Sequence, residues 1–141
     1  MKKNKLELAY ESDFELAGIV CNKKEYKLAW HLNSALDISL TKKDDIKIEF
    51  SKKPAMIISN FQHESDHLLI ELLQNKLISN STGSQFLIPE LKQFDFLLKL
   101  KDETGELNIA NVCGTIKEIP LIEYVTQLNF DDLKSKENLI Y

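Results

Sequence analysis

The string "HESDH", residues 63–67, combines the residue types best suited to metal chemistry in this chain. It spells H-E-x-x-H. On a helix, this spacing places His63 and His67 on one face as zinc ligands, with Glu64 beside the bound water as the general base of a metallopeptidase. A metal-dependent enzyme built on the His63/His67 pair is therefore one hypothesis for this sequence.

The middle of the string favours a turn instead. Ser65 and Asp66 are unfavourable inside a helix and common in turns. No G-x-x-H continuation follows His67 to supply a third ligand. We therefore predict that residues 62–66 connect two antiparallel strands and that the chain has no metal cofactor. His63 and His67 are then at most a weak, adventitious metal site on the surface.

The string "IPELKQFD" holds a second candidate, because Glu90 and Asp95 could form a paired-carboxylate site for acid and base catalysis. A structural role explains the same residue types. Pro89 would fix the backbone where the strand starts, and Glu90 would accept hydrogen bonds from the N–H groups of a turn. Asp95 would pair with Lys99 or cap a neighbouring loop. We interpret the segment as structural, and Glu90/Asp95 is our first choice if the chain is an enzyme acting on a small molecule.

Two further groups of residues could bind rather than react. Trp30 and His31 are neighbours on a predicted helix; we expect Trp30 in the core and His31 at its boundary. The alternative is a ligand pocket lined by Tyr26, Trp30 and His31. The chain closes on three apolar residues, which either pack on the parent domain or bind a second subunit or another protein: Leu139, Ile140 and Tyr141.

Composition limits the class of protein. A chain of 141 residues with 43% hydrophobic and 28% charged content predicts one globular domain over residues 1–141, with residues 129–141 as a C-terminal tail. All 18 basic residues are lysine and the net charge is −4, which disfavours nucleic-acid recognition. The sequence shows neither a signal-peptide pattern nor an apolar run long enough to span a bilayer, so we expect a cytoplasmic protein without membrane contact.

Periodicity predicts the elements that position these residues. One helix is expected over residues 23–36. Tyr26, Ala29 and Trp30 mark one apolar side of this helix, and Leu28 and Leu32 mark another. A second helix follows from the spacing of Ile109, Val112, Cys113 and Ile116 and ends before Pro120. Strands are expected over residues 14–21, 44–50, 54–61, 94–101 and 121–128, whereas residues 67–78 fit either a strand or a helix.

The resulting order is β-α-β-β-β-β-α-β. The short connections in its middle favour an antiparallel sheet with both helices packed on one face, an α+β architecture.

The segment Ile88–Phe96 resembles the motif of the IPExxxVDY family, a group of small bacterial proteins found mainly in Bacteroidota. Ile88, Pro89 and Glu90 match I-P-E, and Phe94, Asp95 and Phe96 stand where the family has V-D-Y. The strings "DFELAGI" and "LKSKENLIY" are similar to the two ends of that family, so the resemblance covers nearly the whole chain. It implies a single compact domain, a hairpin across residues 54–78 and no known activity.

Taken together, the sequence favours a non-catalytic cytoplasmic protein that acts through protein–protein contact or as a homodimer. The alternative is a small-molecule- or metal-dependent enzyme that uses Glu90/Asp95 or His63/His67. A third hypothesis, an RNA-associated accessory protein, would depend on the lysines of the N-terminal half.

Overall fold

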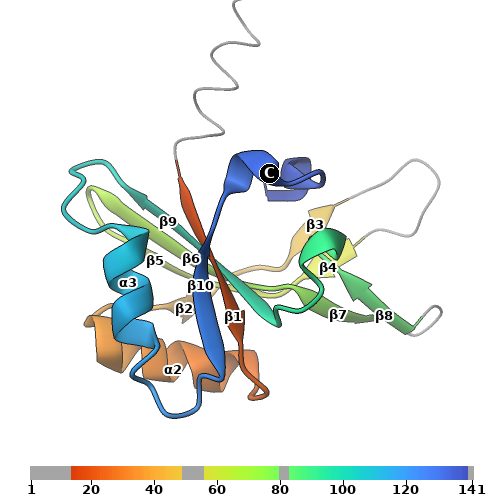
Figure 1. Cartoon of the computed structure of the whole chain (residues 1–141), viewed down its shortest axis with the longest axis horizontal. Coiled ribbons are helices and arrows are strands. Elements are labelled where there is room, and N and C mark those ends of the chain that lie inside the picture. The colour runs from red at the N-terminus through yellow and green to blue at the C-terminus, as the bar shows by residue number, and fades with distance from the viewer. Residues whose placement is uncertain (1–13, 49–55, 80–82, 140–141) are drawn as a thin grey trace, which may run out of the picture.

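The computed structural model describes residues 14–48, 56–79 and 83–139, and in these ranges it shows a six-stranded antiparallel sheet with two α-helices (Figure 1). The strand order in the sheet is β10-β1-β9-β6-β5-β2. The predicted α+β class is therefore confirmed. The elements, in chain order, are β1 (Glu15–Val20), α2 (Glu25–Leu36), β2 (Thr41–Lys42), β3 (Ile46–Ile48), β4 (Met56–Ile58), β5 (Asn60–Glu64), β6 (Leu68–Gln74), β7 (Lys76–Ser79), β8 (Gly83–Phe86), β9 (Phe96–Asp102), α3 (Ile109–Ile116) and β10 (Tyr124–Leu128).

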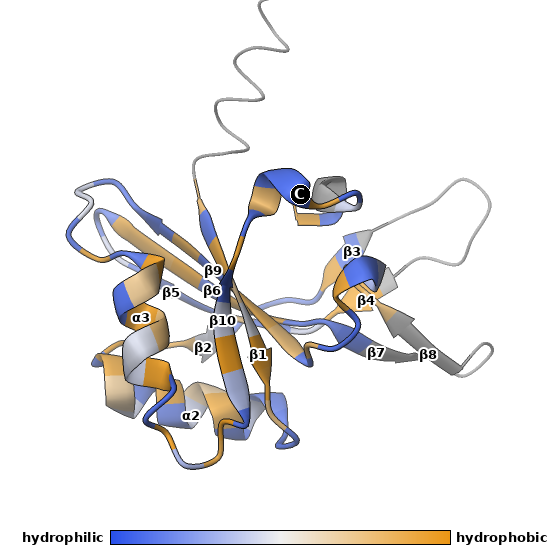
Figure 2. Ribbon diagram, in the orientation of Figure 1, coloured by the Kyte–Doolittle hydropathy of each residue, from blue (hydrophilic) through white to orange (hydrophobic). Residues whose placement is uncertain are grey.

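Both helices pack on one face of the sheet, which we call the helix face. Alternate residues of β1, such as Ala17 and Ile19, point to this face and are fully buried. Leu32 of α2 and Val112 of α3 cover them, at the helical spacing that the sequence pattern predicted. The helix face is thus closed by apolar contact between helices and strands. Figure 2 shows the hydrophobic residues along these helices and strands in orange.

The opposite face of the sheet is also buried, and we call it the second face. Leu16, Leu73 and Leu97 point to it and are fully buried. Three short 3-10 turns and one small two-stranded sheet cover it: Pro89–Leu91, Phe130–Asp132, Lys136–Leu139 and β3–β4. At Gly18 a Cβ atom would lie 2.6 Å from the Phe94 ring, so only glycine allows this ring to pack on β1. The second face therefore lies under segments without regular helices.

Two predicted strands differ from the structure in the same way. Residues 54–61 were expected as one strand, but β4 ends at Ile58 and β5 starts at Asn60. Residues 67–78 are extended, which settles the choice between strand and helix, but β6 and β7 are separated at Asn75. Both breaks let the chain leave the main sheet, because β4 pairs with β3 and β7 pairs with β8. Within the described residues, neither α2 nor α3 has the length and apolar character needed to cross a bilayer.

Candidate functional site

The "HESDH" string forms a β-hairpin turn. His63 and Glu64 belong to β5, residues 65–67 form the turn, and β6 starts at Leu68. The predicted antiparallel connection is confirmed, although β5 extends to Glu64, three residues into the predicted connection of residues 62–66. The helix required by the zinc motif is absent from this segment, and no cluster of three or more His, Cys, Asp or Glu side chains among the described residues could hold a metal ion.

Each histidine of the string has a place in the hairpin. The Nδ1 atom of His63 accepts a hydrogen bond from the Ser39 backbone N–H at 3.0 Å, which ties the loop after α2 to β5. His67 lies in the exposed turn, and its backbone carbonyl accepts a hydrogen bond from the Glu103 N–H at 2.9 Å. The pair thus joins neighbouring segments of the fold.

Glu90 holds the C-terminal segment. Pro89 starts the 3-10 turn Pro89–Leu91, which exposes Glu90 and buries Leu91. The Glu90 carboxylate accepts hydrogen bonds from the Ser135 N–H at 2.7 Å and from the Ser135 hydroxyl at 2.9 Å. Partial burial acts to raise the pKa of Glu90, but the hydrogen bonds from Ser135 outweigh it and keep this pKa below its ordinary value.

Asp95 caps a neighbouring loop, one of the two structural roles expected for it. Its Oδ2 atom accepts a hydrogen bond from the Cys21 N–H at 2.9 Å, directly after β1. Its backbone N–H donates to the Ile19 carbonyl, and its own carbonyl accepts from the Asn75 N–H. Glu90 and Asp95 are therefore engaged with different segments, Ser135 and Cys21.

Asn75 is the polar residue of this region that the sequence analysis missed. It is fully buried between β6 and β7. Its Oδ1 atom accepts from the Ile88 N–H at 2.8 Å, and its Nδ2 group donates to the carbonyls of Leu91 at 3.0 Å and Phe94 at 2.9 Å. The only signal in the sequence is a lone asparagine between two apolar runs. Asn75 binds the buried side of the I-P-E turn, whereas Glu90 links the exposed side of this turn to Ser135.

The C-terminal segment packs on its own domain as far as it is described. Leu139 is fully buried, and its carbonyl accepts a hydrogen bond from Lys99 Nζ at 2.7 Å. The same Nζ atom lies 3.4 Å from a Glu71 carboxylate oxygen and 4.5 Å from the centre of the Phe14 ring. Leu139 therefore packs on its own domain, the first of the two alternatives expected for the three terminal residues. Ile140 and Tyr141 lie outside the described residues.

The outer surface of α2 carries the aromatic side chains. Trp30 is 67% exposed and Tyr26 is 64% exposed, so the expectation that Trp30 belongs to the core is wrong. The helix buries Leu28, Ala29 and Leu32 instead, which leaves Tyr26 and Trp30 on its outer side. His31 is half-buried, and its ring meets Trp30 edge-on at 5.0 Å between centroids and 85° between planes.

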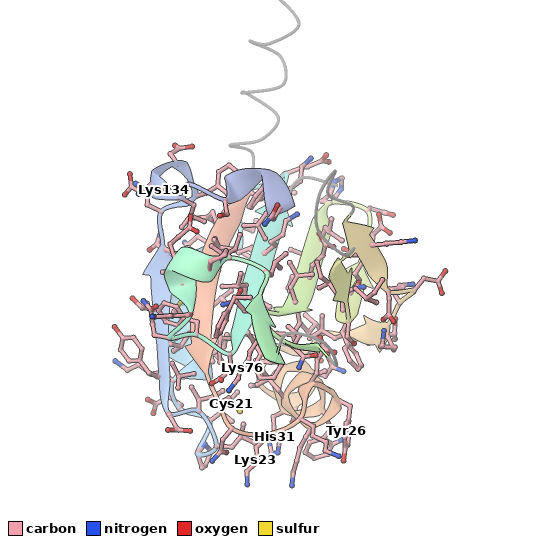
Figure 3. All side chains as sticks on the ribbon, turned by 90° about the vertical axis from the view of Figure 1, so that its right-hand side faces the viewer. Cys21, Lys23, Tyr26, His31, Lys76 and Lys134 are labelled. Atoms are coloured by element: carbon pink, nitrogen blue, oxygen red, sulfur yellow. The ribbon has the colours of Figure 1, made fainter. Side chains whose placement is uncertain are left out.

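These residues form one open surface. Tyr26, Lys27, Trp30 and His31 line a shallow hollow of about 390 Å³, which we call the α2 aromatic surface. Figure 3 shows Lys23, Tyr26 and His31 together, at the end of the molecule opposite Lys134. The predicted ligand-pocket residues therefore lie together, but on the outside of a helix.

Comparison of the chain with protein-family models, with curated proteins and with solved structures found no match. Evidence on function therefore comes from the chemistry of the chain itself. The candidate catalytic side chains Glu90, Asp95 and His63 each accept hydrogen bonds that join segments of the fold. The Tyr26 and Trp30 rings of the α2 aromatic surface, in contrast, are exposed, and among the described residues they have no recorded hydrogen bond to another segment.

Proposed function

We propose that this chain is a non-catalytic domain that binds a partner protein through the α2 aromatic surface. The observation that carries the proposal is the exposure of Trp30 and Tyr26, one helical turn apart. Trp and Tyr are the residues most enriched where binding energy concentrates in protein interfaces. Their rigid rings supply a large contact area at a small loss of side-chain entropy.

The charges around the surface indicate the chemistry of the partner. Lys23 and Lys24 are exposed directly before α2 and Lys27 is exposed in its first turn, whereas the acidic residue of that stretch, Glu25, is buried. A positive rim around an apolar centre attracts carboxylates. The fitting partner segment therefore presents an apolar side chain between Asp or Glu residues.

A protein partner agrees better with the charge distribution than a nucleic acid does. The chain has no arginine, which is the side chain best suited to bidentate contacts with phosphate and guanine, and its net charge is −4. A cytoplasmic location and membership of the IPExxxVDY family belong to the same proposal and rest on the sequence alone. Neither one adds an activity.

Trp30 provides the test, because it is the single tryptophan of the chain. A partner identified by affinity capture from the native host would be purified and titrated against the full chain. We expect the tryptophan emission to shift to the blue on binding, since the indole leaves water. We expect Trp30→Ala to weaken the affinity by about thirtyfold, the effect of a typical hot-spot residue.

The matched control is Tyr124→Ala, which removes an exposed aromatic ring from β10, away from α2. It should leave the affinity for the partner unchanged. An unchanged affinity in Trp30→Ala would refute the proposal. So would tight binding of a single-stranded RNA oligonucleotide that is lost in Trp30→Ala while no protein partner depends on Trp30, and that result would favour the RNA-associated hypothesis.

A further inference from the structure

We propose that two copies of this chain pair antiparallel through β10, so that Tyr124 of each copy enters a hollow beside Leu128 of the other. This surface is separate from the α2 aromatic surface and goes beyond the function proposed above. β10 is the terminal strand of the six-stranded sheet, and among the described residues it pairs with β1 alone, so these residues leave its other edge open (Figure 1).

The backbone groups on the open edge follow from the hydrogen bonds of β1. The Ile19 carbonyl accepts from Asp95 on the β9 side, whereas the Val20 carbonyl accepts from Glu123 on the β10 side. Residues of a strand alternate in direction, so Gly18 faces β10 as Val20 does.

Gly18 is paired with Thr126. Thr126 therefore points its N–H and C=O toward β1, and Val125 and Gln127 point theirs to the open edge. Within the described residues, the one hydrogen bond recorded at these outward groups is a 3.5 Å contact from the Thr126 hydroxyl to the Gln127 carbonyl.

The edge lacks the features that keep strand edges from pairing. Natural edge strands are usually protected by lysine, proline or a β-bulge. Residues 124–130, "YVTQLNF", contain no charged residue and no proline, and the register with β1 is continuous from Tyr124 to Leu128. Tyr, Val and Thr also favour extended structure. This edge is suited to accept another strand.

A projection and a hollow lie on the same face of β10. Tyr124 is 56% exposed, with one side of its ring stacked on Phe94 at 6.3 Å between centroids, and a hollow of about 420 Å³ is lined in part by Phe14, Leu16, Leu128 and Phe130. Tyr124 and Leu128 are four residues apart, so their side chains point to the same face of the strand. A molecule with a projection and a hollow on one edge can complement its own copy.

One register satisfies both the backbone and the side chains. A two-fold axis at Thr126 places Val125 opposite Gln127 of the other copy, which gives hydrogen-bonded pairs on both sides of the axis. It also places each Tyr124 opposite Leu128, at the hollow. Glu123 then faces Asn129, so no like charges oppose each other. An axis at Val125 or Gln127 would instead move Tyr124 away from Leu128.

The first experiment is sedimentation velocity of the full chain over a concentration series. We expect a reversible dimer with a dissociation constant of about micromolar order, because a single strand pair is a small interface. Tyr124→Ala should weaken the dimer by about tenfold or more. Gln127→Pro should do the same, because it removes an N–H that points away from β1 and leaves the β1 ladder intact. Tyr26→Ala, an equally exposed tyrosine on α2, is the control and should have no effect.

The second experiment tests the register by disulfide formation in a Cys113→Ala background. At the two-fold axis, residues 126 form a non-hydrogen-bonded pair with Cα atoms about 4.5 Å apart, a distance that a disulfide can bridge. Thr126→Cys should therefore cross-link two copies under mild oxidation, and Gln127→Cys should not.

A chain that stays monomeric at about 1 mM, where a complex of only 4 kcal/mol would be half formed, would overturn the proposal. Cross-linking by Gln127→Cys but not by Thr126→Cys would overturn it too. So would a dimer that survives Tyr124→Ala and is lost in Trp30→Ala. None of these results affects the binding of a partner protein to α2, which Trp30→Ala tests with the purified partner.

Discussion

The two faces of the sheet are closed by different means. On the helix face, α2 and α3 satisfy most of their own backbone hydrogen bonds and cover the sheet mainly with apolar side chains, such as Leu28 and Ile116. On the second face, irregular segments leave backbone groups that other residues must pair. Asn75, Glu90 and Lys99 supply those partners. Stability on the second face therefore depends on a few polar side chains.

The largest expected loss of stability comes from removing the Asn75 side chain, which lies on the second face. Asn75→Ala leaves the Ile88 N–H and the Phe94 carbonyl without their partner in a buried site, and the Leu91 carbonyl keeps only its bond from the Phe94 N–H. We expect a loss of about 4 kcal/mol in the free energy of unfolding, since each buried unpaired group costs about 1–3 kcal/mol. Urea denaturation would measure it.

Asn33→Ala is the matched control, because Asn33 also binds a backbone, that of Leu40, through both its Oδ1 and Nδ2 atoms. This side chain is half-buried on α2, so water can replace the lost bonds and we expect only about 1 kcal/mol. Equal effects of the two asparagines would show that the second face does not depend more strongly on its polar groups.

The next effect concerns the ion pair beneath the C-terminal segment. Burial lowers the pKa of Lys99, and the charge of Glu71 acts in the opposite direction. Lys99→Met keeps most of the side-chain volume but leaves the buried Glu71 carboxylate and the Leu139 carbonyl without the ammonium group. We expect a loss of about 3 kcal/mol, because removing one partner of a buried pair leaves an uncompensated charge.

The double variant Glu71→Gln/Lys99→Met tests that explanation. It removes both charges, so it should be more stable than Lys99→Met alone. A double variant that is less stable than the single one would mean that Lys99 acts by packing on Phe14 rather than by compensating Glu71.

The sequence predicts the helix face better than the second face. The helix face follows from local periodicity: the spacing of Ile109, Val112 and Ile116 predicted α3 and its buried side. Local periodicity does not predict which side of α2 faces the sheet, because two sides of this helix carry apolar residues. Only the packing in the structure shows that Trp30 faces outward. On the second face the partners are distant, because Asn75 binds residues 13–19 positions away and Glu90 binds Ser135, 45 positions away. No local pattern carries such pairs.

The smallest expected effect compares one carboxylate from each region through the pH dependence of stability. Glu25, in the first turn of α2, is buried and accepts a hydrogen bond from the Ser59 hydroxyl. Burial raises the pKa of Glu25, while Ser59 and Lys42 act to lower it and Asp45 adds to the rise. The folded chain thus holds this proton to a higher pH than the unfolded chain does. Stability should fall as pH rises from the ordinary glutamate value through the raised one.

Glu90 should behave in the opposite way, because its pKa is below the ordinary value in the folded state. Its contribution is present above the ordinary value and is lost as pH falls through the lowered one. Unfolding free energies of Glu25→Gln and Glu90→Gln, each subtracted from those of the unchanged chain between about pH 3 and 8, should therefore slope in opposite directions. Slopes of the same sign would contradict this expectation. They would mean that water reaches the Glu25 carboxylate in solution, so that burial does not raise its pKa.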